Sequence, residues 1–272
     1  MLRSTRTVWG QHTTLSFPPS CYNLSKVNCV FQKVFRKLRK VSKKWSETVK
    51  GAKLIVTIDG PAGSGKSAAA VLLAGRLKVP HLDTGAMYRA VALDALEQGI
   101  QGDAGRIAQR CRSLDLDFDW AKTPAEILLN GRNVADAIRQ PRVTEMTYVA
   151  ADNPQVREEL VKLQRLIGQK AGSLVTEGRD QGTVVFPQAN FKFYLTAQPE
   201  ERARRRIAQL AAKGVTADAQ EILQQIIQRD QRDAARAVGP LARPHDAIDL
   251  DTTNLTLEQV VDAMIQYIQV IR

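Results

Sequence analysis

The stretch that decides the fold is LIVTIDGPAGSGKS, residues 54–67. Residues 54–58 are apolar and mostly β-branched, which is typical of a buried parallel strand. Residues 60–67 match the pattern G-x-x-x-x-G-K-[ST]. Residues 68–77 are rich in Ala, Val and Leu and predict a helix. A strand, a glycine loop and a helix in this order indicate a loop that binds phosphate groups.

The chemistry of phosphate binding requires this order of elements. The glycines allow successive backbone N–H groups to turn inward around a triphosphate, and the helix N-terminus adds partial positive charge. Lys66 can then reach the outer phosphates, and the Ser67 hydroxyl can bind Mg²⁺. The sequence therefore predicts a P-loop nucleotide-binding fold.

Four further apolar segments predict the rest of a parallel sheet, and they are residues 79–83, 174–177, 191–195 and 247–251. Strands that alternate with helices predict a five-stranded parallel sheet with helices on both faces. Ligands of such sheets bind beyond the carboxyl ends of the strands. Arg89, Arg179 and Asp180 follow such ends, so we expect them to converge on the P-loop. Thr256 and Gln259 predict a capping box at the start of the last helix.

A long insertion, about residues 107–172, separates the second strand from the third. Residues 114–120 alternate between apolar and polar, which predicts a half-exposed antiparallel strand. Residues 126–134 predict a hairpin on an Asn-Gly turn, and residues 156–167 predict a helix. A small lobe at the ligand edge of the sheet is what an acceptor-binding subdomain requires.

Two arginine-rich helices are expected within residues 199–241. The first carries the candidate lid residues Arg202, Arg205 and Arg206. The second carries Arg229, Asp233 and Arg236 at positions i, i+4 and i+7, which predicts one shared helical face. A solvated, salt-bridged helix pair would have the same composition. Beside a P-loop we favour a hinged lid, over about residues 199–236, because phosphoryl transfer needs cations around the moving group and exclusion of water.

The net charge of +11 belongs to the N-terminal segment. Residues 1–50 hold eleven of the 39 basic residues and one of the 28 acidic ones, so this segment carries +10 and the rest of the chain +1. We expect residues 1–52 to form a basic, poorly ordered extension. An organelle transit peptide and a basic helix that contacts acidic lipid or nucleic acid are alternatives for this segment.

Hydropathy and cysteine content exclude several classes of protein. The chain has no apolar run of eighteen residues, so no membrane span is expected. Its three scattered cysteines are too few for a disulfide framework or a zinc site. Cys111 is expected to pack as a small apolar residue. This cysteine usage fits a reducing compartment.

From about residue 53 to residue 272 the chain resembles the bacterial-type cytidylate kinases. The resemblance rests on the motifs TIDGPAGSGKS, LDTGAMYR, VREELVKLQR, EGRDQGTVVFP, ERARRR, RDQRDAARAVGPL and DTTNLTLEQV. It implies a P-loop NTPase α/β fold with an enlarged nucleoside-monophosphate-binding insertion and a helical lid. It also implies a cytoplasmic (d)CMP kinase of pyrimidine nucleotide metabolism, which uses ATP and Mg²⁺ to convert CMP and dCMP to CDP and dCDP. A monomer is expected, and no nucleic-acid partner is expected for the body of the chain.

The resemblance also implies roles for individual residues. The residues expected to hold the ATP phosphates are Gly60, Pro61, Ala62, Gly63, Ser64, Gly65, Lys66, Ser67 and Ala68, with Mg²⁺ on Ser67. Those expected to bind CMP are Thr84, Arg89, Thr147, Arg157, Arg179, Asp180, Arg229, Asp233 and Arg236. Among these, the phosphate is assigned to Arg89, Arg179 and Arg236, the cytosine to Thr147, Arg157 and Asp180, and the ribose to Arg229 and Asp233. Lys66, Arg179 and Arg236 are the expected catalytic residues. Residues 148–155 are one residue longer than the family pattern.

Two other functions stay open on the sequence. One is a kinase of another small acceptor, such as UMP or a non-nucleotide. The other is a nucleic-acid-dependent ATPase, for which the basic extension is the motive. Deletion of residues 1–50 separates the second from the kinase interpretation, since only the ATPase would lose activity with the extension.

Overall fold

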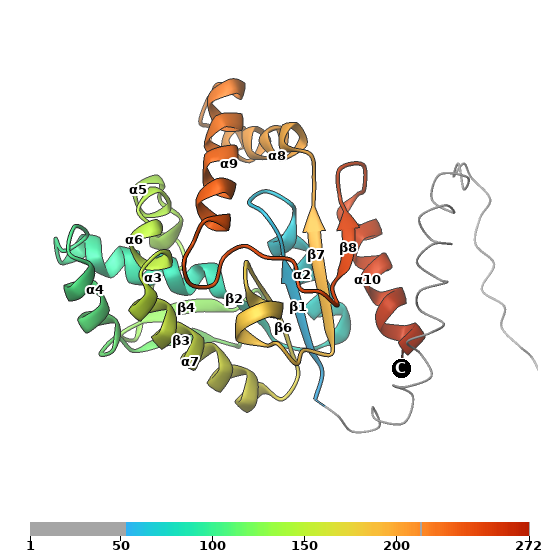
Figure 1. The fold of residues 1–272 in the computed structure, drawn as a ribbon, viewed down its shortest axis with the longest axis horizontal. Coiled ribbons are helices and arrows are strands. Elements are labelled where there is room, and N and C mark those ends of the chain that lie inside the picture. The colour runs from blue at the N-terminus through green and yellow to red at the C-terminus, as the bar shows by residue number, and fades with distance from the viewer. Residues whose placement is uncertain (1–52, 213, 272) are drawn as a thin grey trace, which may run out of the picture. The chain divides into compact units, whose positions relative to one another are not determined.

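Five parallel strands form the central sheet of this computed structural model, which describes residues 53–212 and 214–271 (Figure 1). They are β1 (Ile55–Asp59), β2 (His81–Asp83), β6 (Leu174–Gly178), β7 (Phe191–Thr196) and β8 (Ile248–Asp251). The strand order is β2-β6-β1-β7-β8. The predicted parallel sheet is therefore confirmed, with strand ends shifted by two residues at most. The strand before the P-loop lies at the centre of the sheet.

The register of the sheet brings the strand ends to one level. Asp59, the last residue of β1, lies opposite Gly178 of β6. Asp83, the last residue of β2, lies opposite Glu177 of β6. The segments that follow β1, β2 and β6 therefore start beside one another, at the edge where ligands of such sheets bind.

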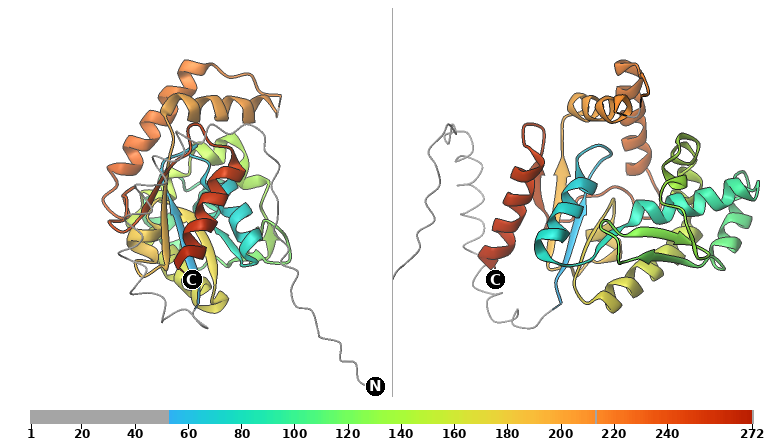
Figure 2. Two further views of the ribbon diagram at one scale, coloured as in Figure 1. Left: turned by 90° about the vertical axis from the view of Figure 1, so that its right-hand side faces the viewer. Right: turned by 180° about the vertical axis from the view of Figure 1, so that it is seen from behind.

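Helices cover both faces of the sheet. They are α2 (Lys66–Leu77) and α10 (Leu257–Ile271) on one face, and α3 (Thr84–Glu97) and α7 (Pro154–Ala171) on the other (Figure 2). Along β1 the side chains alternate, as the pleat requires. Val56 and Ile58 belong to the apolar cluster with α2 and α10, and Ile55 packs against the cluster with α3 and α7. The predicted capping box is confirmed, since the Thr256 N–H donates to Gln259 Oε1 at 2.9 Å.

The insertion between β2 and β6 contains a small antiparallel sheet and short helices. Its elements besides α7 are α4 (Ala104–Cys111), β3 (Leu116–Asp119), β4 (Glu126–Leu129), β5 (Arg132–Asn133), the 3₁₀ helix η1 (Ala137–Arg139), α5 (Pro141–Glu145) and α6 (Tyr148–Ala151). The predicted hairpin turn is confirmed, with positive φ at Asn130 and Gly131. Helix α7 extends beyond the predicted 156–167 because the Asn153 side chain caps its first N–H groups and Pro154 suits the first position.

The two arginine-rich helices are α8 (Pro199–Ala211) and α9 (Ala219–Ala234), which lie beyond the carboxyl end of the sheet (Figure 1). They pack on each other through a small cluster of their own, around Ala203 and Ile226. The predicted shared helical face is wrong for Arg236, because α9 ends at Ala234. The chain then turns through Gly239, at φ 60°, into Pro240, which cannot continue a helix.

Three further expectations from the sequence concern Cys111, a membrane span and residues 1–52. Cys111 is a free, buried thiol, as predicted, and burial raises its pKa to about 11. None of the helices within residues 53–212 and 214–271 is both long and apolar enough to cross a membrane. Every expectation for residues 1–52 lies outside the described residues.

Candidate active site

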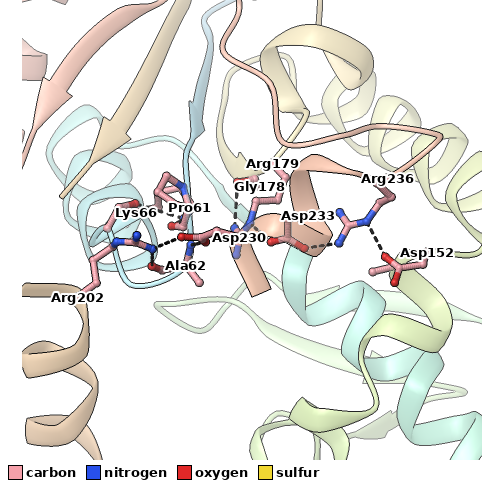
Figure 3. A network of polar contacts seen from close by, with 12 residues as sticks. Pro61, Ala62, Lys66, Asp152, Gly178, Arg179, Arg202, Asp230, Asp233 and Arg236 are labelled. Atoms are coloured by element: carbon pink, nitrogen blue, oxygen red, sulfur yellow. Dashed lines mark hydrogen bonds and ion pairs between the residues drawn. The ribbon is translucent and has the colours of Figure 1, made fainter. Parts of the chain in front are cut away.

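The P-loop connects β1 to α2 and is shaped by glycines. Gly63 and Gly65 have φ of 76° and 89°, a conformation that side chains disfavour, and Gly65 precedes the first residue of α2. The Lys66 Nζ donates to the carbonyl oxygen of Pro61 at 2.6 Å (Figure 3). Burial, together with the nearby Arg179, lowers the pKa of Lys66 well below its usual value. A bound polyanion would stabilise the charged form of this lysine.

A cavity of about 240 Å³ adjoins the P-loop and extends to the insertion and the lid. It is lined by Ala62, Gly63, Lys66 and Ser67 on the P-loop side. All nine residues predicted to bind the acceptor line it as well: Thr84, Arg89, Thr147, Arg157, Arg179, Asp180, Arg229, Asp233 and Arg236. The lining carries six cationic and four carboxylate side chains, a surplus of two positive charges. The structure thus brings together residues as far apart in the sequence as Ala62 and Arg236.

Carboxylates hold most of the arginines of this cavity in place. Asp83 binds Arg89 with an Oδ2–Nη2 distance of 3.0 Å. Asp233 accepts from Arg179 Nε at 2.7 Å on one oxygen and from Arg236 on the other (Figure 3). Although burial opposes ionisation, Arg179 and Arg236 keep the pKa of Asp233 below its ordinary value. Arg229 makes no ion pair among the described residues and projects from α9 without a carboxylate partner.

Arg157 and Asp180 form a buried ion pair at the far end of the cavity. Their side chains are only 3% and 4% exposed. Arg157 Nη1 also donates to the Ala151 carbonyl at 3.0 Å, and its guanidinium lies over the Tyr88 ring at 5.2 Å from the centroid. Burial raises the pKa of Asp180 even though Arg157 opposes that shift. Arg157 Nε is buried without a partner within the described residues, so a ligand acceptor atom could satisfy it.

The three candidate lid arginines have different environments. Arg202 is buried, donates to the carbonyl of Ala62 at 3.0 Å and pairs with Asp230 of α9 (Figure 3). Arg205 donates to the hydroxyl and the carbonyl of Thr252 at 2.9 and 2.6 Å. Arg206 is exposed and makes no ion pair among the residues that the structure describes. Arg202 therefore joins α8 to the P-loop, while Arg206 forms no such contact within the described residues.

Known proteins are similar in sequence over the whole segment that carries this site. The family model for cytidylate kinase matches residues 56–270. A cytidylate kinase of Citrifermentans bemidjiense is 46% identical over 213 residues, which cover 78% of this chain and 91% of that protein. A cytidylate kinase of Limosilactobacillus reuteri is 44% identical over 218 residues, which cover 79% of this chain and 95% of that protein. This chain belongs to the cytidylate kinase family. The fold class and the family implied by the sequence motifs are both confirmed.

Several residues of the cytidylate kinase site were not predicted from the sequence. Asp83 both caps α3, accepting from the Ala86 N–H at 2.9 Å, and binds Arg89. Its position directly before the helix is a capping signal that could have identified it. Glu177 and Tyr88 also line the cavity, yet their own sequence positions give no signal of that. Asp152 and Asp230 become recognisable only because the fold places them beside Arg236 and Arg202.

The oxygen atoms near the P-loop fit a magnesium ion bound together with a nucleotide. The Ser67 residue lines the cavity and is exposed, so its hydroxyl is accessible. Glu177 lines the same cavity, and its Oε1 is buried with no hydrogen-bond partner in the described part of the chain. Hydroxyl and carboxylate oxygens suit this cation. No cluster of three or more His, Cys, Asp or Glu side chains that could hold a metal by itself occurs among the described residues.

Proposed function

We propose that this protein transfers the γ-phosphoryl group of ATP to CMP and dCMP, forming CDP or dCDP and ADP. The observation that supports this best is one cavity in which a P-loop, with its Lys66, faces five arginine and four carboxylate side chains. The surplus of two positive charges complements a phosphate monoester, which is mostly dianionic at pH 7 because its second pKa is about 6. A nucleoside monophosphate provides such a group, and the P-loop provides the site for the donor triphosphate.

Positioning and electrostatics would supply the catalysis. The acceptor phosphate is itself the nucleophile and is already ionised, so no general base is required. Lys66 leaves the Pro61 carbonyl and binds the transferring group from the P-loop side. Arg179 and Arg236, both bound to Asp233, face the same group from the other side of the cavity. The lid helices exclude water, which strengthens each of these interactions.

The ion pair at the far end of the cavity would recognise the base. Cytosine presents a carbonyl acceptor and an amino donor next to each other. Arg157 supplies donors and Asp180 supplies an acceptor, and both are buried, so a base with the wrong pattern leaves polar groups unpaired. Thr147 lines the same part of the cavity, although its hydroxyl donates to the Val143 carbonyl at 3.0 Å. Arg229 and Asp233 would bind the ribose.

Mg²⁺ is part of the proposal. The Ser67 hydroxyl, with Glu177 close to the same cavity, would hold the ion. The chemistry that the bound ion would supply is neutralisation of negative charge on the ATP phosphates. Removal of Mg²⁺ with EDTA should abolish turnover without unfolding the protein, since the described part of the chain has no metal site of its own.

A substrate panel tests the proposed activity. ADP release is measured with ATP and each of CMP, dCMP, UMP, AMP and shikimate. CMP and dCMP should give the highest kcat/KM. Equal turnover of UMP or AMP, or no turnover of CMP, would contradict the proposal.

The variant Asp180→Ala tests base recognition within the same assay. Without Asp180 the amino group of bound cytosine would be buried without its acceptor, which costs about 1–3 kcal/mol, so kcat/KM for CMP should fall by roughly 10- to 100-fold, chiefly through KM. The KM for ATP should change little. Asp249→Ala is the control, because it removes an exposed ion pair with Arg243 outside the cavity. Unchanged CMP kinetics in Asp180→Ala would rule out this role.

We propose a monomer as the functional unit, because one chain supplies all nine residues that are predicted to bind the acceptor, and we propose the cytoplasm as its compartment. Light scattering of the purified full-length chain, at concentrations used in the assay, tests the first point. A particle of twice the 30.1 kDa chain mass would contradict it.

A further inference from the structure

The insertion and the lid meet beside the cavity, at the turn between α6 and α7. Asp152 follows the last residue of α6, and its N–H donates to the Tyr148 carbonyl at 2.9 Å. Asn153 caps α7 and also donates to the Ala104 carbonyl at 2.8 Å. Both ends of this turn are therefore anchored within the insertion, and the Asp152 side chain projects from a fixed backbone toward the end of α9 (Figure 3).

Two contacts join α9 and the residues after it to this part of the insertion, one at Asp152 and one at Tyr148 of α6. Arg236 Nε donates to Asp152 Oδ1 at 2.7 Å. The guanidinium of Arg232 lies over the ring of Tyr148, 5.1 Å from its centroid. A charge-assisted hydrogen bond and a cation–π contact each contribute to holding α9 against α6.

The Arg236 side chain depends on carboxylates for its orientation. It lies past the end of α9, so helical backbone geometry does not fix its direction. Asp233 accepts from Nη2, but the same carboxylate also binds Arg179, and one contact leaves the guanidinium free to rotate about it. Asp152 supplies a second hydrogen-bond acceptor, for Nε, and so fixes the orientation of the guanidinium. With both contacts made, the side chain is only 7% exposed, and its hydrogen bonds to described residues use Nε and Nη2, not Nη1.

We propose that Asp152 is a positioning residue for the acceptor phosphate: it orients Arg236 and couples closure of the lid on the insertion to acceptor binding. The inference rests on the proposed function of Arg236. Asp152 does not line the cavity, so it acts through the Arg236 guanidinium that it holds. Because it belongs to the insertion and Arg236 to the lid, the arginine reaches its bound orientation only when the two parts are together.

The kinetic consequence is specific to one substrate. Without Asp152, a long side chain must be ordered by the acceptor phosphate itself, and ordering such a side chain costs on the order of 1–2 kcal/mol. The KM for CMP in Asp152→Ala should therefore rise about tenfold. The KM for ATP should stay within about twofold, since the P-loop contacts of Lys66 and Arg202 are untouched. Asp152→Asn retains an acceptor oxygen and should give an intermediate value.

Glu97→Gln is a matched control. Glu97 binds Arg132 with an O–N distance of 2.7 Å and is 34% exposed, the same as Asp152. That ion pair joins α3 to the hairpin and lies away from the cavity lining. Its loss should leave the KM values for both substrates unchanged. If Glu97→Gln raises the KM for CMP as much as Asp152→Ala does, the effect is general destabilisation and the proposal is wrong.

A double-mutant cycle with Arg236→Met completes the test. When Arg236 is absent, Asp152→Ala should cause no further rise in the KM for CMP. An equal rise in both backgrounds would overturn the proposal, because Asp152 would then act by another route. Wild-type turnover of CMP is measured first: its absence refutes the proposed function, whereas normal turnover with an unchanged KM in Asp152→Ala refutes only this inference.

Discussion

The two sides of the cavity are built by different means. The P-loop side, residues 60–68, is one continuous segment whose phosphate-facing groups are mostly backbone N–H groups. The arginine side consists of Arg89, Arg157, Arg179, Arg229 and Arg236, which come from α3, α7, the end of β6 and the region of α9. Glycine conformations shape the first side, and carboxylates from other elements orient most of the second.

The difference has a physical origin. Backbone groups carry partial charges and are fixed by the fold, so they can be held close together without ligands. Guanidinium groups carry full charges and long side chains, so they repel one another and must be ordered. The acids Asp83, Asp180 and Asp233 offset the repulsion and select one orientation for each arginine. A binding site made of arginine side chains therefore needs a second set of residues, here carboxylates, that orient these side chains.

Lys66 is the main exception on the P-loop side, since there one side chain carries a full charge. We expect Lys66→Met to reduce kcat about 1000-fold, because removal of one preorganised charge from a transition-state site costs 100- to 1000-fold or more. Lys162→Met, which removes a lysine exposed on α7, is the control. A fall of less than tenfold in kcat for Lys66→Met would mean that backbone groups alone suffice.

Gly239 tests whether the arginine side also relies on backbone. Its φ is 60°, and a Cβ there would overlap Arg157 Nη2 and Asp180 Oδ2. Gly239→Ala should raise the KM for CMP about 30-fold, since the loop must move off the ion pair and strained positions cost about 1–3 kcal/mol. Gly99→Ala is the control, because Gly99 has a similar φ of 64° and a Cβ at that position would meet no atom within 4 Å. If both variants give the same kinetics, backbone strain and not contact with the pair is responsible.

Arg202 and Arg206 test how the P-loop is tied to the lid. Arg202→Ala should raise the KM for ATP about tenfold, because it removes a charge-assisted hydrogen bond to Ala62 worth about 1.5–3 kcal/mol. Arg206→Ala, at an exposed position without an ion pair in the described part of the chain, should change it less. The reverse order would show that the free arginine moves onto ATP and carries the catalytic role.

Asp59, at the end of β1 before the P-loop, contacts the segment that follows Arg179 and Asp180. Its ionisation is expected to change the stability of the protein and not its kinetics. Its carboxylate accepts from the N–H groups of Gln181 and Gly182 at 2.9 and 2.7 Å. Burial nevertheless raises its pKa to about 6. A raised pKa means that the folded protein binds the proton more tightly. The stabilisation is therefore complete below the unfolded pKa near 4 and is lost as the pH rises through 6.

The free energy of unfolding should accordingly fall between pH 4 and pH 6.5, by about 3 kcal/mol at most from this residue. Urea titrations of the wild type and of Asp59→Asn give the free energy of unfolding at each pH. The contribution of Asp59 is the difference between the two proteins in the slope of this free energy against pH. Identical slopes would mean that Asp59 stays ionised in the folded protein at all these pH values.

Prediction from sequence succeeded where neighbouring residues determine the local structure by themselves. The strand, the glycines and Lys66 of the P-loop are contiguous, and the hairpin turn at Asn130 and Gly131 is set by two residues. It failed at Arg236, where helical spacing was extrapolated past Ala234. Beyond that residue the Leu241 N–H donates to the Asp233 carbonyl at 2.8 Å, and the chain turns at Gly239, with φ 60°, before Pro240. None of these belongs to the helical pattern itself.

The sequence by itself determined the fold class, the family and the residue types of the site, because local pattern and motif spacing carry that information. The tertiary structure decided which acid holds which arginine. Asp83 and Arg89 form a local pair, since Asp83 ends β2 and Arg89 lies in the helix α3 that follows it. Asp233 with Arg179 and Asp152 with Arg236 join segments 54 and 84 residues apart. Such pairs follow from chain topology, since the energy of a side-chain contact depends on distance in space and not on separation along the chain.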